Sequence, residues 1–113
     1  MIRNRSQDQW TLQFFLNYVD FEMSLQQALD APTMHSSHFP SSFYPRTAYP
    51  GRVSIEDRVP VSVMNELSRR GHEVIEVSGW VNGKVMGIHF DADRGVISGA
   101  VVAKGTIGYA LAW

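Results

Sequence analysis

The stretch Asp8–Val19, DQWTLQFFLNYV, presents apolar side chains on nearly every side of a helix. One stripe at helical spacing consists of Leu12, Phe15, Leu16 and Val19. A second stripe, at intervals of four residues, consists of Trp10, Phe14 and Tyr18. The narrow polar sector that remains consists of Gln9, Gln13, Asn17 and Asp20. Such a helix needs cover on more than one side, for example a sheet below and further polypeptide above, and a domain this small has little material for both.

A second helix follows directly. Ser24 and Gln27 have the spacing of a capping box, and Leu25, Ala28 and Leu29 form the inward face. Pro32 ends this helix because proline cannot continue the backbone hydrogen bonding.

The stretch from Pro32 to Asp57 is rich in proline, serine and aromatic residues, which predicts irregular structure with one strand near Arg52–Glu56. A loop of this length in a compact domain is usually functional or covers another part of the protein.

The third helix is predicted to begin with Pro60 in its first position and to stop at Gly71. Its apolar face consists of Val63, Met64 and Leu67, and Arg69 and Arg70 lie in its last turn. Beyond it the period becomes strand-like. The predicted strands are Glu73–Val77, Lys84–Phe90 and Val96–Ala103. Asn82-Gly83 predicts a hairpin between the first two, and Asp91–Gly95 a turn before the third.

These elements predict an α+β fold of about three helices and three to four mostly antiparallel strands, in one domain spanning residues 1–113. Hydrophobic residues make up 44% of the chain and charged residues 19%, a balance typical of a globular protein. The formal net charge is −1 and no basic run exceeds Arg69-Arg70, which argues against a nucleic-acid partner.

The chain has no cysteine, so disulfides, thiolate nucleophiles and cysteine-based zinc sites are excluded. No segment reaches membrane-spanning length, and the N-terminal residues lack the apolar stretch of a signal peptide. We therefore expect no membrane partner and, by default, a cytoplasmic location, although a longer parent protein could be exported.

Candidate chemistry is sparse. His35 and His38 have a spacing that can serve a metal, but no third or fourth ligand is nearby, so loop histidines without a ligand are favoured. Ser36 and Ser37 beside them do not indicate a triad, because triad members normally meet through the fold. Asp91–Gly95 departs from a calcium loop at Gly95 and is interpreted as a β-turn. Trp10, Phe14 and Tyr18 are assigned to core packing rather than to a binding stripe.

Several segments together resemble the gamma-glutamyltransferase family, in particular the C-terminal part of its small subunit and its acylase-like bacterial branch. The most specific segments are Asp30-Ala31-Pro32 and His38–Ser42, after the opening run that begins at Gln7. Others are Arg70–Val74, Asp93–Ala100 and Gly108-Tyr109-Ala110. Two positions depart from the family pattern. Glu22 replaces a usual glycine, which leaves a local turn in doubt, and Ala103-Lys104 replaces a frequent Pro-Arg pair, which leaves the late loop in doubt.

The resemblance implies a partial N-terminal-nucleophile-hydrolase fold, an αββα sandwich to which this chain contributes one helical layer and some strands. It also implies a nucleophilic N-terminal threonine whose own amine acts as base. In the family that threonine, the substrate-binding residues and the oxyanion glycines precede the segment resembling Ser6–Trp10. Arg3-Asn4 stands where the glycine pair would fall. The expected catalytic, cofactor-binding and metal residues in this chain are therefore none, and no cofactor is expected.

Two functions from different classes are consistent with this pattern. The first is a C-terminal portion of a gamma-glutamyltransferase-like protein, related to gamma-glutamyl transfer or hydrolysis, for example of glutathione, and inactive alone. The second is a non-enzymatic module that docks on a separately encoded catalytic half or self-associates, because an exposed apolar patch usually marks an interface.

Overall fold

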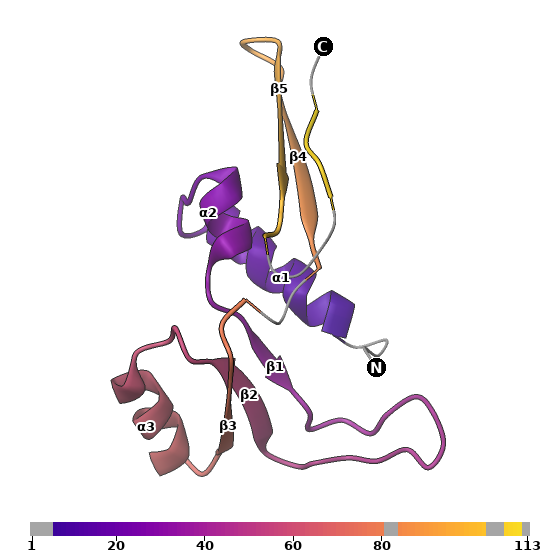
Figure 1. The fold of residues 1–113 in the computed structure, drawn as a ribbon, viewed down its shortest axis with the longest axis vertical. Coiled ribbons are helices and arrows are strands. Elements are labelled where there is room, and N and C mark those ends of the chain that lie inside the picture. Colours follow the sequence, from indigo (N-terminus) through magenta and orange to yellow (C-terminus); the bar gives the residue numbers. More distant parts are fainter. Residues whose placement is uncertain (1–5, 81–83, 104–107, 112–113) are drawn as a thin grey trace.

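The computed structural model describes residues 6–80, 84–103 and 108–111. These residues form three helices and five strands in two separate sheets (Figure 1). The helices are α1 (Ser6–Val19), α2 (Leu25–Asp30) and α3 (Val61–Arg69). The strands are β1 (Met34–Ser36), β2 (Arg52–Glu56), β3 (Glu73–Val77), β4 (Met86–Asp91) and β5 (Val96–Val101). The predicted α+β class is confirmed. None of the helices among the described residues combines the length and the hydropathy of a membrane-spanning segment.

The predicted helix α2 is confirmed down to its cap. The Ser24 hydroxyl accepts a hydrogen bond from the Gln27 N–H at 3.2 Å, and the Gln27 side chain accepts one from the Ser24 N–H at 3.1 Å. This reciprocal pair is the capping box. The helix ends at Asp30, and Ala31 is extended with φ −56° and ψ 147° because it precedes Pro32.

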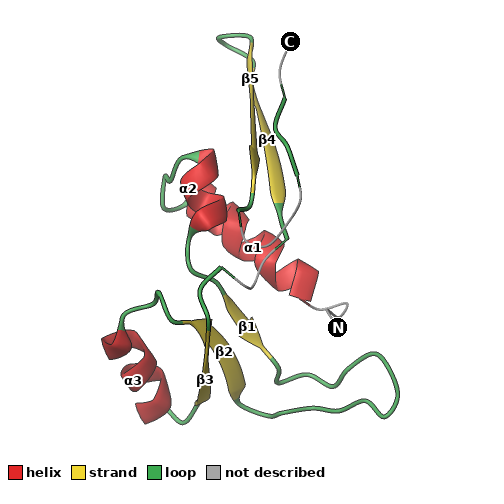
Figure 2. Cartoon of the chain, viewed as in Figure 1, coloured by secondary structure: helices red, strands yellow, loops and turns green. Residues whose placement is uncertain are grey.

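One sheet has the order β1-β2-β3, and it contains a parallel pairing that the sequence pattern did not reveal. β1 is antiparallel to β2, whereas β2 and β3 are parallel and joined by α3 (Figure 2). α3 packs its buried Met64 against Val53 and Ile55 of β2. The helix begins at Val61 with Pro60 as its N-cap, one residue later than predicted, and Gly71 follows it with a positive φ of 96°.

The predicted hairpin between Glu73–Val77 and Lys84–Phe90 is wrong in its pairing. β3 pairs with β2 in one sheet, and β4 pairs with β5 in the other. The physical reason is that each of the two strands has another partner, because α3 returns β3 parallel to β2 and the tight turn after Asp91 pairs β4 with β5. The Asn82-Gly83 signal itself lies outside the described residues.

β1 is a three-residue strand inside the stretch predicted to be irregular. Two glutamine side chains of α1 support its outer edge. The Gln9 amide accepts from the Ser36 N–H at 2.7 Å and donates to its carbonyl at 3.1 Å. The Gln13 amide does the same for Met34, at 2.9 and 2.8 Å. One turn of helix separates the two glutamines, so they reach the backbone groups of Met34 and Ser36, which face away from β2. They thereby cover the edge of β1 that would otherwise be open to pairing with another strand.

The second sheet, β4–β5, is a two-stranded ribbon that packs one face on the helices. Its inner face carries Gly87 opposite Ala100, and Ala100 joins Leu29 and Val102 in a buried cluster. Phe14 of α1 packs against that cluster. A Cβ on Gly87 would lie 2.8 Å from the Phe14 ring, so glycine permits this close approach of strand and helix.

Candidate functional site

The structure places His35 and His38 in different environments. His35 lies in β1 beside the buried Trp10, with ring centroids 6.3 Å apart. His38 is exposed, and its Nδ1 accepts a hydrogen bond from the Gly51 N–H at 3.0 Å. No group of three or more potential metal ligands exists among the residues that the structure describes. The two histidines therefore act in the packing of β1 and of the following loop.

The neighbouring serines contribute mainly through their backbone. The Ser37 N–H donates to the Arg52 carbonyl at 3.0 Å, and its carbonyl accepts from the Tyr49 N–H at 3.1 Å. The Ser36 hydroxyl accepts from the His38 N–H at 3.4 Å. These bonds close the base of the long loop between β1 and β2, which extends away from the sheet (Figure 2).

Burial lowers the pKa of His35 from its usual 6.5, because the charged imidazolium loses hydration beside Trp10. The neutral imidazole of His35 is thus favoured in the folded state. The neutral His35 side chain stabilises the fold fully at pH values above its pKa in the unfolded state. This contribution to the free energy of unfolding declines as the pH falls below that pKa. We expect the free energy of unfolding to decrease more between pH 7.5 and pH 5.5 in the wild type than in His35→Gln. Urea denaturation at several pH values measures this, and parallel profiles would contradict it.

The segment Asp91–Gly95 is a turn, as predicted. The Asp91 carboxylate accepts hydrogen bonds from the N–H groups of Asp93 and Arg94, both at 3.1 Å. Gly95 has a φ of 64°, the left-handed conformation that closes the turn. The carboxylate that would ligate calcium is thus used by the turn's own backbone.

A buried ion pair lies at the end of β2, and no motif in the sequence predicted it. Glu56, at the end of β2, is fully buried, and its carboxylate accepts a hydrogen bond from Arg58 at 2.6 Å. A second bond comes from the Thr33 hydroxyl at 2.9 Å. A buried carboxylate needs such partners because burial removes its hydration.

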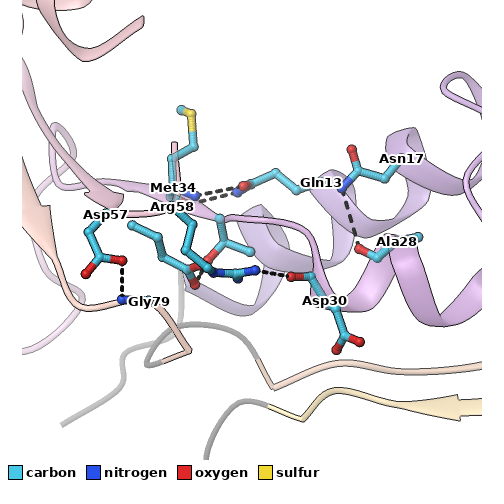
Figure 3. A network of polar contacts seen from close by, with 10 residues as sticks. Gln13, Asn17, Ala28, Asp30, Met34, Asp57, Arg58 and Gly79 are labelled. Atoms are coloured by element: carbon cyan, nitrogen blue, oxygen red, sulfur yellow. Dashed lines mark hydrogen bonds and ion pairs between the residues drawn. The ribbon is translucent and has the colours of Figure 1, made fainter. Parts of the chain in front are cut away.

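Arg58 connects this ion pair to the other elements. Its guanidinium donates to the Asp30 carbonyl at 2.8 Å, at the end of α2 (Figure 3). It also stacks over the Trp80 ring, 4.0 Å from the centroid, where Trp80 adopts a positive φ of 70°. Next to it, the Asp57 carboxylate accepts from the Gly79 N–H at 2.8 Å (Figure 3). These contacts connect the end of β2 to the end of α2 and to the segment that follows β3.

The outer face of the β4–β5 ribbon is apolar and largely exposed, and residues 108–111 lie against part of it, next to Gly99 and Val101. Met86, Ile88 and Phe90 point to this side from β4, and their exposed fractions are 63%, 80% and 62%. Ile97 of β5 is 68% exposed on the same side. A groove of about 690 Å³ runs between this face and residues 108–111, where Tyr109 and Leu111 contribute to its lining. This ribbon face is therefore a candidate binding surface.

Comparison with known proteins identifies relatives along nearly the whole chain. The sequence model of the gamma-glutamyltranspeptidase family matches residues 5–106. The acylase ACY 1 proenzyme of Pseudomonas sp. (strain V22) is 34% identical over 89 residues, which are 79% of this chain and 13% of that protein.

Solved structures agree with these matches. The structure of LmbA2991HD is 39% identical with a TM-score of 0.91, over 99% of this chain and 20% of that one. The cephalosporin acylase of Bacillus halodurans is 26% identical with a TM-score of 0.72, over 91% of this chain and 17% of that one. The chain thus spans about a fifth or less of the length of these relatives.

Proposed function

Because this chain belongs to the gamma-glutamyltranspeptidase family, in its acylase-like branch, we propose that it is the C-terminal portion of a small subunit and is inactive alone. The parent activity is gamma-glutamyl transfer or hydrolysis, or cleavage of a related acyl amide, by an N-terminal threonine outside this chain. Residues 1–113 act as one folding unit within that larger protein. The contribution of the chain is to complete the N-terminal-nucleophile fold.

The observation that carries this proposal is the ribbon face. In a two-layer arrangement of helices on a sheet, the second face of the sheet is stable in water only if it is polar or covered. Met86, Ile88 and Phe90 make it apolar and exposed. A second sheet packing about 10 Å away would bury these side chains and produce two inner β-layers with helices outside. A complementary part of the parent is the partner that supplies this sheet.

Absence of turnover in the isolated chain is the first test. We expect no release of nitroaniline when the purified chain is incubated with gamma-glutamyl-4-nitroanilide, because a self-contained site needs nucleophile, base and oxyanion donors that converge. A mock purification from the same host gives the background rate. Turnover above that background that co-elutes with the chain through two columns, and that disappears when the chain is removed by affinity capture, would contradict the proposal.

Self-association through the same ribbon face is the second candidate, and the exposure of Ile88 and Ile97 favours it. Two copies could bury their ribbon faces against each other when no complementary part is present. Size-exclusion chromatography with light scattering distinguishes the states. A dimer that Ile88→Lys converts to a monomer supports this candidate, whereas a well-behaved wild-type monomer counts against it.

A further inference from the structure

Trp10 of α1 is buried, and its indole N–H has no hydrogen-bond partner among the described residues. Only 6% of the residue is exposed, and Nε1 has essentially no contact with bulk solvent. A buried indole N–H usually finds an acceptor, because burial otherwise removes its hydration without replacement. Packing of the apolar ring alone therefore does not account for the burial of this N–H group.

Trp10 borders a small cavity where α1 and α2 meet the base of the β4–β5 ribbon. The cavity volume is about 10 Å³. That is room for one water molecule and for no larger ligand. The apolar part of its lining consists of Phe14, Ala28, Leu29, Val85 and Val102. The polar part consists of Trp10, Gln13, Asn17 and Thr33, so the described lining carries no charged side chain.

Two of the lining side chains are able to accept a hydrogen bond. Asn17 donates from Nδ2 to a backbone carbonyl of α2 at 3.5 Å, and its side-chain oxygen accepts no bond from a described residue. The Thr33 hydroxyl donates to Glu56 at 2.9 Å, which leaves its oxygen lone pairs able to accept. Gln13 is already engaged with the edge of β1. Together with the Trp10 N–H, the lining thus offers three polar partners, the usual number for a buried water.

We propose that one water molecule occupies this cavity, accepts a hydrogen bond from Trp10 Nε1 and donates to Asn17 and Thr33. A cavity with a purely apolar lining stays dry, but this lining includes a buried donor and two acceptors. An ion would lose its hydration here with no charged side chain in the described lining to replace it. Because Thr33 also donates to Glu56, the water links α1 to the buried ion pair of Glu56 and Arg58. The site does not depend on the proposed function.

Magnetic resonance on the full chain tests the proposal. Cross-relaxation between water and the Trp10 indole proton is measured in the laboratory frame (NOE) and in the rotating frame (ROE). A water that stays bound for longer than the protein takes to tumble gives NOE and ROE cross-peaks of opposite sign, whereas surface water and proton exchange give cross-peaks of the same sign. We expect opposite signs at Trp10. Trp80, which is 46% exposed, is the matched control and should lack this pattern. Trp10→Phe identifies the resonance by its loss.

A pair of matched variants locates the water. Asn17→Leu keeps a similar volume but removes one acceptor, so it should abolish the cross-peaks of opposite sign. Asn65→Leu makes the same change at an exposed position of α3 and should leave them unchanged.

A crystal structure of the wild-type chain provides a second measurement that needs no variant. It should show a water about 2.7–3.2 Å from Trp10 Nε1. A protein acceptor at that distance, or the absence of the Trp10 cross-peaks in the folded wild type, would overturn the proposal. Unchanged cross-peaks in Asn17→Leu would overturn the assigned bridge.

Discussion

Replacing Glu56 with alanine is expected to destabilise the fold by about 3–5 kcal/mol, the cost of breaking a buried ion pair by removing one partner. The loss leaves the Arg58 guanidinium, only 25% exposed, without its carboxylate, and leaves the Thr33 hydroxyl without its acceptor. Urea denaturation followed by circular dichroism measures the effect. Glu56→Gln, which keeps the shape and one acceptor oxygen, is expected to retain folding with a smaller loss.

Two further variants make the test specific. Glu56→Leu combined with Arg58→Met removes both charges, so it should cost far less than the sum of the two single changes. Glu73→Gln breaks an exposed ion pair with Arg52, whose hydrogen bonds hold the pKa of Glu73 below its usual range. Because that carboxylate is in water, its loss should barely move the denaturation midpoint. A Glu56→Ala midpoint as close to wild type as that of Glu73→Gln would contradict the assigned role.

Replacing Gly87 with valine is expected to produce the second large loss, about 1–3 kcal/mol or more, because the new side chain enters a filled space. A Cβ on Gly87 would already meet Phe14 at 2.8 Å and Leu25 at 3.2 Å. Either the tips of these two side chains or the strand itself must shift to make room. Thermal and urea denaturation measure the change, and loss of Trp10 burial can be followed by fluorescence.

Gly99 provides the matched control on the other face of the same ribbon. It lies opposite Ile88, and among the described residues a Cβ there would come within 4 Å only of Ala110, at an ordinary 3.6 Å. Gly99→Val should therefore be tolerated, and a β-branched residue suits a strand. Equal destabilisation by the two substitutions would contradict the assignment of an inner, packed face and an outer, open face.

The local elements were largely predictable from the sequence. The capping box at Ser24, the stop before Pro32 and the strand near Arg52 depend on neighbouring residues, and each is where the pattern predicts it. The apolar side chains on nearly every side of α1 also predicted that the chain alone would not cover this helix. Phe15 and Leu12 are indeed exposed. The resemblance predicted the family, which the comparisons confirm.

The features that were missed depend on contacts between distant segments. β1 is stable because Gln9 and Gln13, more than twenty residues earlier, satisfy its edge. The parallel pairing of β2 with β3 depends on where α3 packs. The Asn82-Gly83 dipeptide is a local turn signal and carries no information on the packing of α3. Glu56 follows an apolar strand residue and resembles any surface acid in the sequence, because its partners Thr33 and Arg58 meet it only in the fold.

Assembly with a complementary part is the most direct test of the account. The protein of the LmbA2991HD structure, shortened by the fifth of its length that this chain matches, serves as a surrogate for that part, because the matched segment is 39% identical to this chain. After both polypeptides are confirmed to be folded by circular dichroism, they are mixed and analysed by size-exclusion chromatography with light scattering. The account predicts a one-to-one complex that Ile88→Lys prevents and Tyr44→Ala does not. Separate elution of two folded polypeptides, or a complex that Ile88→Lys leaves intact, would contradict it.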